Sequence, residues 1–250
     1  MTAAFTGRRM LVTGGAKGIG RATVQRFLDG GAQVACLDMD GVALAGLKQT
    51  RRVVALEADV TDTVSVEAAV AEAAARMGGL DGVVNSAGVD LQSCLEDMTD
   101  AAWERLIAVN LTGPMKVCRT AVPFLRAAGG GTIVNVSSGA GLQPLKFRSA
   151  YSASKAGLQM FSKSLAMELA EAGIRVNAIC PGAVETPLFR SSIAGGDTGE
   201  AQLDAVRVRY ALARIAGPDE IAAGIAFLSS AEASYVTGVA LAVDGGRTFH

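Results

Sequence analysis

The sequence predicts a single α/β domain, a doubly wound parallel sheet of seven strands with helices on both faces. Short runs that are apolar throughout alternate along the chain with longer alanine-rich stretches of helical character. Strands without polar alternation are typical of parallel sheets that are buried on both faces. No linker, repeat or low-complexity tract divides the 250 residues, so we expect one domain over 1–250.

The predicted elements follow one another in the order that a doubly wound sheet requires. The predicted strands are Arg9–Thr13, Gln33–Asp38, Arg52–Glu57, Gly82–Asn85, Thr132–Ser137, Arg175–Cys180 and Ala240–Val243. The predicted helices are Gly18–Leu28, Val42–Gln49, Val64–Met77, Asp100–Val109, Gly113–Ala128, Ala150–Ala172 and Asp219–Leu228. The Gly- and Ser-rich stretch Pro187–Gly199 belongs to neither set. We expect it to form part of a flexible substrate flap at about 187–212.

Composition excludes several classes of function. The net charge of −1 gives no basic field to attract nucleic acid or an anionic membrane. No run approaches the roughly 18 uncharged apolar residues of a membrane-spanning helix, and the first residues do not resemble a secretory signal. Only 19% of the residues are charged, below the roughly 25% of typical domains, which suggests burial between subunits as well. We expect a cytoplasmic enzyme.

The cysteines and the histidine argue against metal and triad chemistry. Cys36, Cys94, Cys118 and Cys180 are far apart, and the one histidine is at position 250. Neither a zinc site nor a histidine-based triad can be assembled from this set. We expect four reduced structural thiols and no metal.

A glycine-rich turn follows the first predicted strand and reads TGGAKGIG over 13–20. Glycine permits a tight turn and lets backbone N–H groups approach a pyrophosphate at a helix N-terminus. Such turns also occur without a ligand. Here Asp38 closes the second strand, eighteen residues beyond Gly20, where this fold holds a ribose 2′-hydroxyl. We therefore predict a dinucleotide site that includes Gly14, Lys17, Gly18, Ile19, Gly20 and Asp38.

Asp38 also bears on the choice of cofactor. A carboxylate accepts hydrogen bonds from the ribose hydroxyls and repels the 2′-phosphate of NADP. The next residue is Met39 rather than an arginine that would bind this phosphate. Lys17 argues for NADP, since a cation in the glycine loop can contact a phosphate. Because Asp38 faces the 2′ position directly, we expect NAD.

A tyrosine and a lysine are spaced for acid–base chemistry in the segment YSASK, residues 151–155. Residues four apart lie on one face of a helix, so Tyr151 and Lys155 project together. A free tyrosine has a pKa near 10 and is a poor base at neutral pH. A neighbouring ammonium group favours the phenolate. The hypothesis is that Tyr151 takes the proton of a substrate hydroxyl group.

Together these motifs resemble the classical short-chain dehydrogenase/reductase family. The loop has the family's TGxxxGIG form and 151–155 its Tyr-x-x-x-Lys form; Asn85–Gly88 resembles its NNAG segment, with a departure at Ser86. Asn110, Ser138 and Pro181-Gly182 followed by Thr186 also match, in the family's order over nearly the whole chain. The resemblance implies a Rossmann-type NAD-binding domain that moves a hydride between NAD and a secondary alcohol or ketone.

The resemblance also implies roles for individual residues. The catalytic set is Ser138, Tyr151, Lys155 and Asn110, in which Ser138 binds the substrate oxygen, Lys155 the nicotinamide ribose and Asn110 a water of the proton relay. Further cofactor contacts are Asp59 and Val60 at the adenine, Asn85, Ala87 and Gly88 along the cofactor, and Val184 and Thr186 at the carboxamide. Each of these could instead be an ordinary strand-end or turn residue. The family's C-terminal end packs in a subunit interface, so we expect a homotetramer.

Two arginines bear on the substrate. Arg148 and Arg209 match positions at which cytosolic 3-hydroxybutyrate dehydrogenases and dehydrogenases of 2-keto-3-deoxy sugar acids bind the substrate carboxylate. Arginine suits this task because its planar fork pairs with a carboxylate. We expect a small hydroxy acid, either a 2-keto-3-deoxy sugar acid such as 2-keto-3-deoxy-L-rhamnonate or L-fuconate, or 3-hydroxybutyrate. Solvated arginines without a ligand are the alternative interpretation.

Three other functions are compatible with the same motifs. The first is a 3-oxoacyl-carrier-protein reductase, although such enzymes usually use NADPH. The second is a dehydrogenase of neutral sugars or cyclic alcohols, for which Arg148 would be incidental. The third is a non-catalytic NAD-binding regulator, which the intact Ser138, Tyr151, Lys155 and Asn110 disfavour.

Overall fold

The computed structural model describes residues 4–47, 52–193 and 199–248. Seven parallel strands form one sheet in the order β3-β2-β1-β4-β5-β6-β7. The strands are β1 Arg9–Thr13, β2 Gln33–Asp38, β3 Val53–Glu57, β4 Gly82–Asn85, β5 Gly131–Val136, β6 Ile174–Pro181 and β7 Ala240–Val243. The predicted doubly wound parallel sheet is confirmed, with the strand order reversing between β1 and β4.

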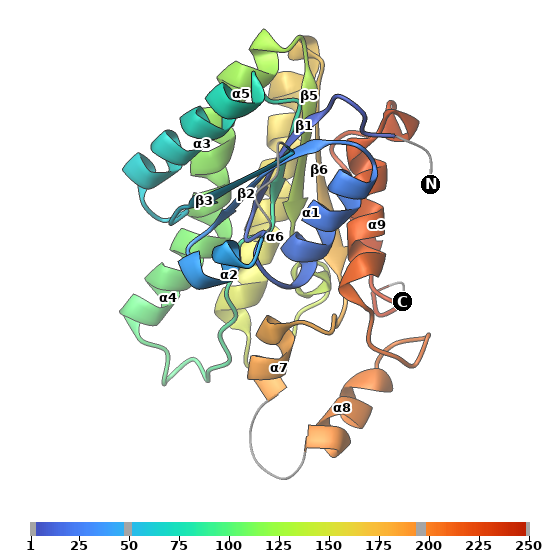
Figure 1. Cartoon of the computed structure of the whole chain (residues 1–250). Helices are drawn as coiled ribbons and strands as arrows, with labels where there is room; N and C mark the ends of the chain where they lie inside the picture. Colours follow the sequence, from blue (N-terminus) through green and yellow to red (C-terminus); the bar gives the residue numbers. More distant parts are fainter. Residues whose placement is uncertain (1–3, 48–51, 194–198, 249–250) are drawn as a thin grey trace.

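The helices form a layer on each side of the sheet (Figure 1). They are α1 Gly18–Asp29, α2 Gly41–Ala45, α3 Thr63–Met77, α4 Asp100–Ile107, α5 Gly113–Ala127, α6 Ser149–Leu169, α7 Pro187–Ile193, α8 Gly199–Arg207 and α9 Pro218–Ser229. A π-helical turn, Ala108–Thr112, joins α4 to α5 where the sequence predicted a break. Helix α2 is shorter than the predicted Val42–Gln49, of which 48 and 49 lie outside the described residues.

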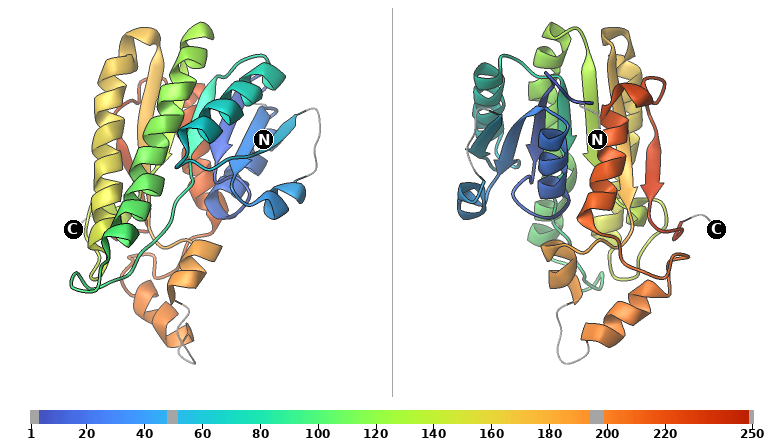
Figure 2. Two further views of the ribbon diagram at one scale, coloured as in Figure 1. Left: turned by 90° about the vertical axis from the view of Figure 1, so that its left-hand side faces the viewer. Right: turned by 45° about the vertical axis from the view of Figure 1, so that its right-hand side comes forward.

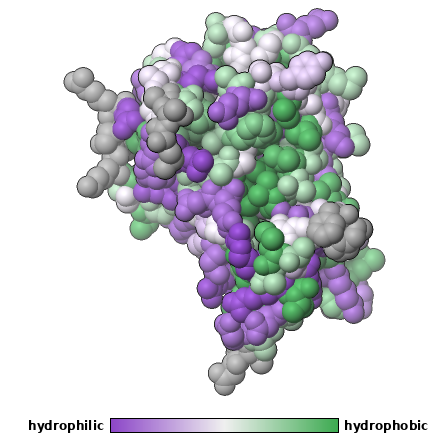
Figure 3. Space-filling view, turned by 90° about the vertical axis from the view of Figure 1, so that its right-hand side faces the viewer, coloured by the Kyte–Doolittle hydropathy of each residue, from purple (hydrophilic) through white to green (hydrophobic). Residues whose placement is uncertain are grey.

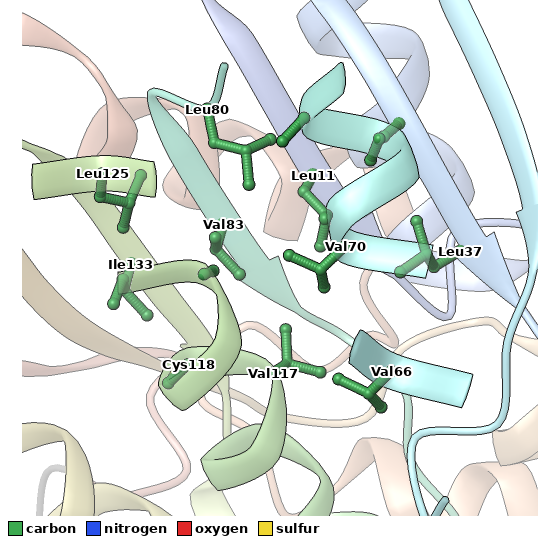
Figure 4. Packing of buried hydrophobic residues seen from close by; sticks show 14 of the residues in the cluster. Leu11, Leu37, Val66, Val70, Leu80, Val83, Val117, Cys118, Leu125 and Ile133 are labelled. Carbon is green, nitrogen blue, oxygen red and sulfur yellow. The ribbon is translucent and has the colours of Figure 1, made fainter. Parts of the chain in front are cut away.

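Two hydrophobic clusters sandwich the sheet and explain why its strands are apolar throughout. Successive side chains of a strand point to opposite faces. Leu11 of β1 accordingly packs with α3, α5 and α6, while Met10 and Val12 pack with α1 and α9. Figure 4 shows the first cluster, with Val70 and Val117 directed toward Leu11 and Val83 of the sheet. The two views of Figure 2 show the same helix layers from other sides.

Part of the region expected to be a flexible flap is helical. Helix α7 begins at Pro187, and the preceding Thr186 side chain accepts a hydrogen bond from the backbone N–H of Phe189. A threonine cap followed by proline is a helix-start signal, so Thr186-Pro187 marks a helix where the glycines and serines further along suggest a loop. Helix α8 follows after 194–198, which lie outside the described residues. Both helices project beyond the carboxyl ends of the strands (Figure 1).

All four cysteines are free thiols. Cys36, Cys118 and Cys180 are buried, and burial raises the pKa of their thiols to about 12, 12 and 11. Within the described part of the chain, no helix is long and apolar enough to span a bilayer. The same residues contain no cluster of three or more His, Cys, Asp or Glu side chains suited to a metal ion.

Candidate active site

A cavity of about 1100 Å³ opens at the carboxyl ends of the strands, where the strand order reverses. This is the position at which doubly wound sheets bind their ligands. The loops after β1 to β6 contribute to its wall, and α7, α8 and the segment after β7 enclose it from the other side. One continuous space therefore joins the predicted cofactor residues to the predicted catalytic residues.

The glycine turn forms a cradle that admits no larger side chains. A Cβ atom on Gly14, whose φ is +63°, would lie 2.7 Å from the Cα atom of Ala87, and one on Gly20 would lie 2.1 Å from the Gly14 carbonyl oxygen. Helix α1 starts beyond Lys17 without a side-chain cap, whereas Asp62 caps α3 and Thr99 caps α4. The first N–H groups of α1 are therefore available to an anion, as a dinucleotide pyrophosphate requires.

Asp38 is held at the edge of this cradle by backbone donors. Its carboxylate accepts hydrogen bonds from the N–H groups of Ala16 at 3.0 Å and Asp40 at 3.1 Å. The charge of Lys17 is the sequence feature that argues for NADP. Its Nζ atom lies 2.5 Å from the Asp40 carboxylate. Its charge is therefore already balanced by a neighbouring acid, while the Asp38 carboxylate faces the cavity.

Most of the predicted cofactor residues line this cavity, namely Gly14, Lys17, Gly18, Ile19, Gly20, Asp38, Asp59, Val60, Ala87, Gly88, Val184 and Thr186. Asn85 does not. Its side chain is buried and donates hydrogen bonds to Asn135 at 2.8 Å and to Cys118 at 3.3 Å. The Asn85 side chain is therefore directed away from the cavity, and the prediction that Asn85 lies along the cofactor stays a prediction.

Ser138, Tyr151 and Lys155 meet at the centre of the cavity. Ser138 follows β5, and Tyr151 and Lys155 lie one turn apart on α6. The Ser138 side chain hydrogen-bonds to Tyr151, and the Lys155 Nζ atom lies 5.7 Å from the centre of the Tyr151 ring. Lys155 also donates to the carbonyl of Val136 at 2.9 Å. This arrangement places a hydroxyl donor, a phenol and an ammonium group around one point.

Burial dominates the ionisation of this group. Burial raises the pKa of Tyr151, while the Ser138 hydrogen bond and the Arg148 charge lower it. Burial lowers the pKa of Lys155 to about 8, against the opposing influence of Cys180. The sequence-based expectation that Lys155 lowers the Tyr151 pKa is therefore incomplete. The enclosed site disfavours the phenolate, and the groups that favour it are Ser138 and Arg148.

Asn110 lies beneath the cavity wall rather than in it. It is fully buried in the π-helical turn, where its amide accepts from the N–H of Val89 and donates to the carbonyl of Val89, both at 2.9 Å. It also donates to the Ser154 hydroxyl at 3.3 Å. Asn110 thus ties the loop after β4 to the catalytic helix α6, as a positioning residue. Its predicted contact with a relay water stays a prediction.

The two predicted substrate arginines have different surroundings. Both line the cavity. Arg148 forms an ion pair with Asp90, and both side chains are mostly buried. Arg209, just beyond α8, is exposed and has no acidic partner among the described residues. The Arg148 charge is therefore neutralised within the protein, whereas that of Arg209 is not.

Sequence reasoning missed three residues that line the substrate end of the cavity: Asp90, Tyr210 and Arg247. Asp90 lies two residues beyond Gly88, and Arg247 follows the last strand. The Tyr210 hydroxyl accepts a hydrogen bond from the N–H of Ala183 at 2.9 Å. None of them belongs to a local motif, so the sequence carried no signal for them beyond the charges of Asp90 and Arg247.

Comparisons with known proteins agree with this geometry. A family model described as enoyl-(acyl carrier protein) reductase matches residues 14–248. The cis-4-hydroxycyclohexanecarboxylate dehydrogenase of Sinomonas cyclohexanicum is 42% identical over 99% of this chain and 99% of its own length. The chain belongs to the short-chain dehydrogenase/reductase family. It is a dehydrogenase that acts on CH–OH groups, and members of this family typically use a nicotinamide cofactor.

Other short-chain dehydrogenases/reductases show how varied the substrates are. The 2-(S)-hydroxypropyl-CoM dehydrogenase 3 of Xanthobacter autotrophicus is 37% identical, with 95% of each chain covered. The crystal structure of levodione reductase superposes with a TM-score of 0.94 at 33% identity, over 98% of each chain. These relatives share the fold over nearly the whole chain, while their names give different substrates.

Proposed function

We propose that this protein oxidises the secondary hydroxyl group of a small hydroxy acid with NAD as the hydride acceptor. The observation that carries the proposal is the division of one cavity into two unlike halves. Asp38 and Asp59 line the nucleotide half, while Ser138, Tyr151 and Lys155 lead to a substrate half with cations, Arg209 among them, that form no ion pair within the described residues. The carboxylate in the substrate named for the 42% identical relative supports the same class of substrate.

In the proposed reaction, the proton of the substrate hydroxyl group passes to Tyr151. Ser138 holds the substrate oxygen, and the Tyr151 Oη atom accepts its proton as the C–H bond breaks. Bound NAD supplies the acceptor for the hydride. A protonated Lys155, 5.7 Å from the centre of the Tyr151 ring, would add to Ser138 and Arg148 as a group that favours the phenolate in the closed site. Enclosure by α7 and α8 excludes water from the reacting atoms.

NAD is proposed over NADP because of what surrounds Asp38. The carboxylate is fixed by two backbone donors and faces the cavity, where it would accept the ribose hydroxyls. The 2′-phosphate of NADP would lie beside the Asp38 carboxylate, and the two negative charges would repel each other. Lys17 is paired with Asp40 and so gives no uncompensated cation for that phosphate.

Three hydroxy acids represent the proposed class. The sequence favours a 2-keto-3-deoxy sugar acid or 3-hydroxybutyrate, and the comparison adds 4-hydroxycyclohexanecarboxylate. Apolar side chains in the substrate half, among them Leu145, Phe147, Leu188 and Phe189, suit the ring of the last one. A neutral cyclic alcohol is the second candidate substrate, which the same apolar lining favours. A cytoplasmic location and a homotetramer stay proposals.

The test is NADH formation by the purified protein with a panel of alcohols, with NADP in parallel. The panel contains 2-keto-3-deoxy-L-rhamnonate, 3-hydroxybutyrate, cis-4-hydroxycyclohexanecarboxylate and 4-methylcyclohexanol as the neutral ring. The expected result is a higher kcat/KM for an acid than for the neutral alcohol, with NAD preferred. Activity confined to neutral alcohols would contradict the hydroxy acid, and a preference for NADP would contradict the role of Asp38.

A further inference from the structure

The far wall of the cavity carries cations that the proposed mechanism does not use. Lys146, Arg209 and Arg247 line both the main cavity and a shallower pocket that adjoins it. This adjoining pocket is lined by no acidic side chain of the described residues. In the same part of the chain, no ion pair joins any of the three cations to a carboxylate. The wall therefore carries three cations that form no ion pair within the described residues.

Arg247 is the fixed member of this group. Only 7% of the residue is exposed, although an arginine is almost never buried to this extent without a partner. Its Nη2 atom donates to the carbonyls of Gln143 at 3.0 Å and Pro144 at 3.3 Å. No described acceptor binds its Nε or Nη1 atoms. One edge of the guanidinium is thus anchored to neutral carbonyls, and its remaining donors are available to a ligand.

The anchoring also places Arg247 close to the chemistry. A Cβ atom on Gly139, the residue directly after Ser138, would lie 3.3 Å from the Arg247 Nη1 atom. The same short segment, Ser138 to Pro144, therefore carries the hydroxyl that binds the reacting oxygen and the carbonyls that hold the guanidinium. Ser138 and Arg247 both line the main cavity.

Arg148 lies in a different environment. Its guanidinium pairs with Asp90, and 17% and 12% of the two side chains are exposed. Binding a substrate carboxylate there would place a second anion beside Asp90 or require the ion pair to break, and both are costly in a buried site. The balanced charge of Arg148 makes it a poor anion ligand, while the unbalanced charge of Arg247 makes it a good one.

We infer that Lys146, Arg209 and Arg247 form an anion subsite that binds the carboxylate of the substrate, with Arg247 as the central ligand. The inference rests on the proposed function in taking this anion to belong to the substrate. The planar guanidinium edge of Arg247 matches a carboxylate with two hydrogen bonds. Exposed Lys146 and Arg209 attract the anion from the cavity mouth. Arg148 and Asp90 instead form a neutral side wall.

A binding experiment tests the subsite without turnover. The NAD-loaded protein is titrated calorimetrically with cyclohexanecarboxylate, which lacks the reacting hydroxyl group, and with the neutral cyclohexanecarboxamide. The wild type should bind the carboxylate more tightly than the amide. Arg247→Met should weaken carboxylate binding about tenfold or more, the factor expected for losing a charge-assisted hydrogen bond, and leave amide binding unchanged. The carboxylate affinity of Arg247→Lys should lie between those of the wild type and Arg247→Met, because lysine keeps the charge but not the planar fork.

Two further sets of variants guard against a folding effect. Lys146→Met and Arg209→Met change exposed side chains, and each should weaken carboxylate binding severalfold with an unchanged melting temperature. Arg190→Met is the matched control, since Arg190 lies on α7 outside the cavity lining and pairs with Glu185. It should bind the carboxylate as the wild type does.

The outcomes separate this inference from the proposed function. If the wild type binds the carboxylate no better than the amide, or if Arg148→Met weakens carboxylate binding more than Arg247→Met does, the subsite is wrong. If carboxylate binding depends on Arg247 but no hydroxy acid is oxidised with NAD, the subsite stands and the proposed function fails. If hydroxy acids are oxidised and Arg247→Met leaves their KM unchanged, the proposed function stands and the subsite fails.

Discussion

At the scale of single residues, the site consists of ionisable groups whose hydration is reduced by burial. Burial raises the pKa of Tyr151 and lowers that of Lys155, so each charged form is disfavoured in the protein by itself. Both charged forms gain when a partner of opposite charge enters the same enclosed space. The residues are therefore arranged for a ligand rather than for the stability of the free protein.

Tyr151→Phe should lower kcat by at least about 10²-fold, the contribution typical of a positioned general base. The ring stays and only the hydroxyl group is lost, so the fold and the cofactor site should be preserved. NADH binding, followed by its fluorescence, should match that of the wild type. A variant that folds, binds NADH and turns over near the wild-type rate would exclude Tyr151 as the base.

Comparison of Lys155→Met with the wild type should show how much the buried Lys155 ammonium group lowers the free energy of unfolding. Burial lowers the pKa of Lys155 in the folded protein to about 8, from the ordinary value of 10.5. Below pH 8 the amine is charged in both the folded and unfolded states, and folding bears the full penalty, about 3 kcal/mol. Between pH 8 and 10.5 only the unfolded state holds the proton, so the wild type gains stability relative to the variant. Urea unfolding of both proteins at pH 7.5 and 10 measures this difference, and a gap that does not change with pH would contradict it.

Asp38→Ser should shift the choice of cofactor. Serine loses the charge that repels a 2′-phosphate and keeps one acceptor for the loop N–H groups that now bind Asp38. The kcat/KM for NAD should fall about tenfold, while that for NADP should rise. Steady-state kinetics with both cofactors check the shift. Unchanged selectivity would show that Asp38 does not face the 2′ position.

The residues that could be predicted from the sequence are those in local motifs. The spacing of Tyr151 and Lys155 on one helix decides that they meet, and the structure places them one turn apart. No role could be predicted for Asp90 or Arg247 from the sequence, because the role of each depends on the groups that it contacts in the folded protein. The partner of Asp90 lies 58 positions away at Arg148. The partners of Arg247 are carbonyl groups that its own sequence surroundings do not reveal.

At the scale of elements, two irregular turns position the site. The β1–α1 turn presses Gly14 against the backbone at Ala87, and the π-helical turn directs Asn110 to Val89. Both therefore fix the loop after β4, which lines the cavity. The sequence predicted the strands within two residues at each end. It missed the π-helical turn, since one extra residue in a helical turn leaves no mark on the hydrophobic period.

Gly20→Ala should impair cofactor binding through the backbone. The added Cβ atom would lie 2.1 Å from the Gly14 carbonyl oxygen, so the turn must shift before the alanine fits. The dissociation constant for NADH should rise about tenfold or more, because the N–H groups that face the pyrophosphate move with the turn. Gly46→Ala is the control, since its nearest neighbour would lie at 3.4 Å. Equal NADH affinity in both variants would contradict the close approach.

At the scale of the whole molecule, charge is divided along the cavity. Acidic side chains follow β2 and β3, and the opposite wall carries cations that form no ion pair in the described part of the chain. The face that carries α9 has hydrophobic surface at its centre, above a largely hydrophilic projection (Figure 3). Phe227 of α9 is 41% exposed and Tyr235 beyond it is fully exposed, which suits the proposed subunit interface.

Helices α7 and α8 should become ordered over the cavity when NADH binds. They line its outer wall and have few buried residues, so their amides should exchange rapidly in the free protein. Hydrogen exchange measured by mass spectrometry should slow in peptides from Pro187–Ile193 and Gly199–Arg207. Peptides from α3, remote from the cavity, serve as the control. Unchanged exchange in α7 and α8 at saturating NADH would show that neither helix closes.

The free cysteines have a practical consequence. The thiolate is the form that reacts with electrophiles, and burial holds Cys36, Cys118 and Cys180 in the thiol form. Cys94 is only half-buried and lies on the loop between β4 and α4, four residues beyond Asp90. A maleimide dye should therefore label the native protein at Cys94 alone, without replacement of any other cysteine. The attached fluorophore would mark the loop after β4, on which Asp90 pairs with Arg148.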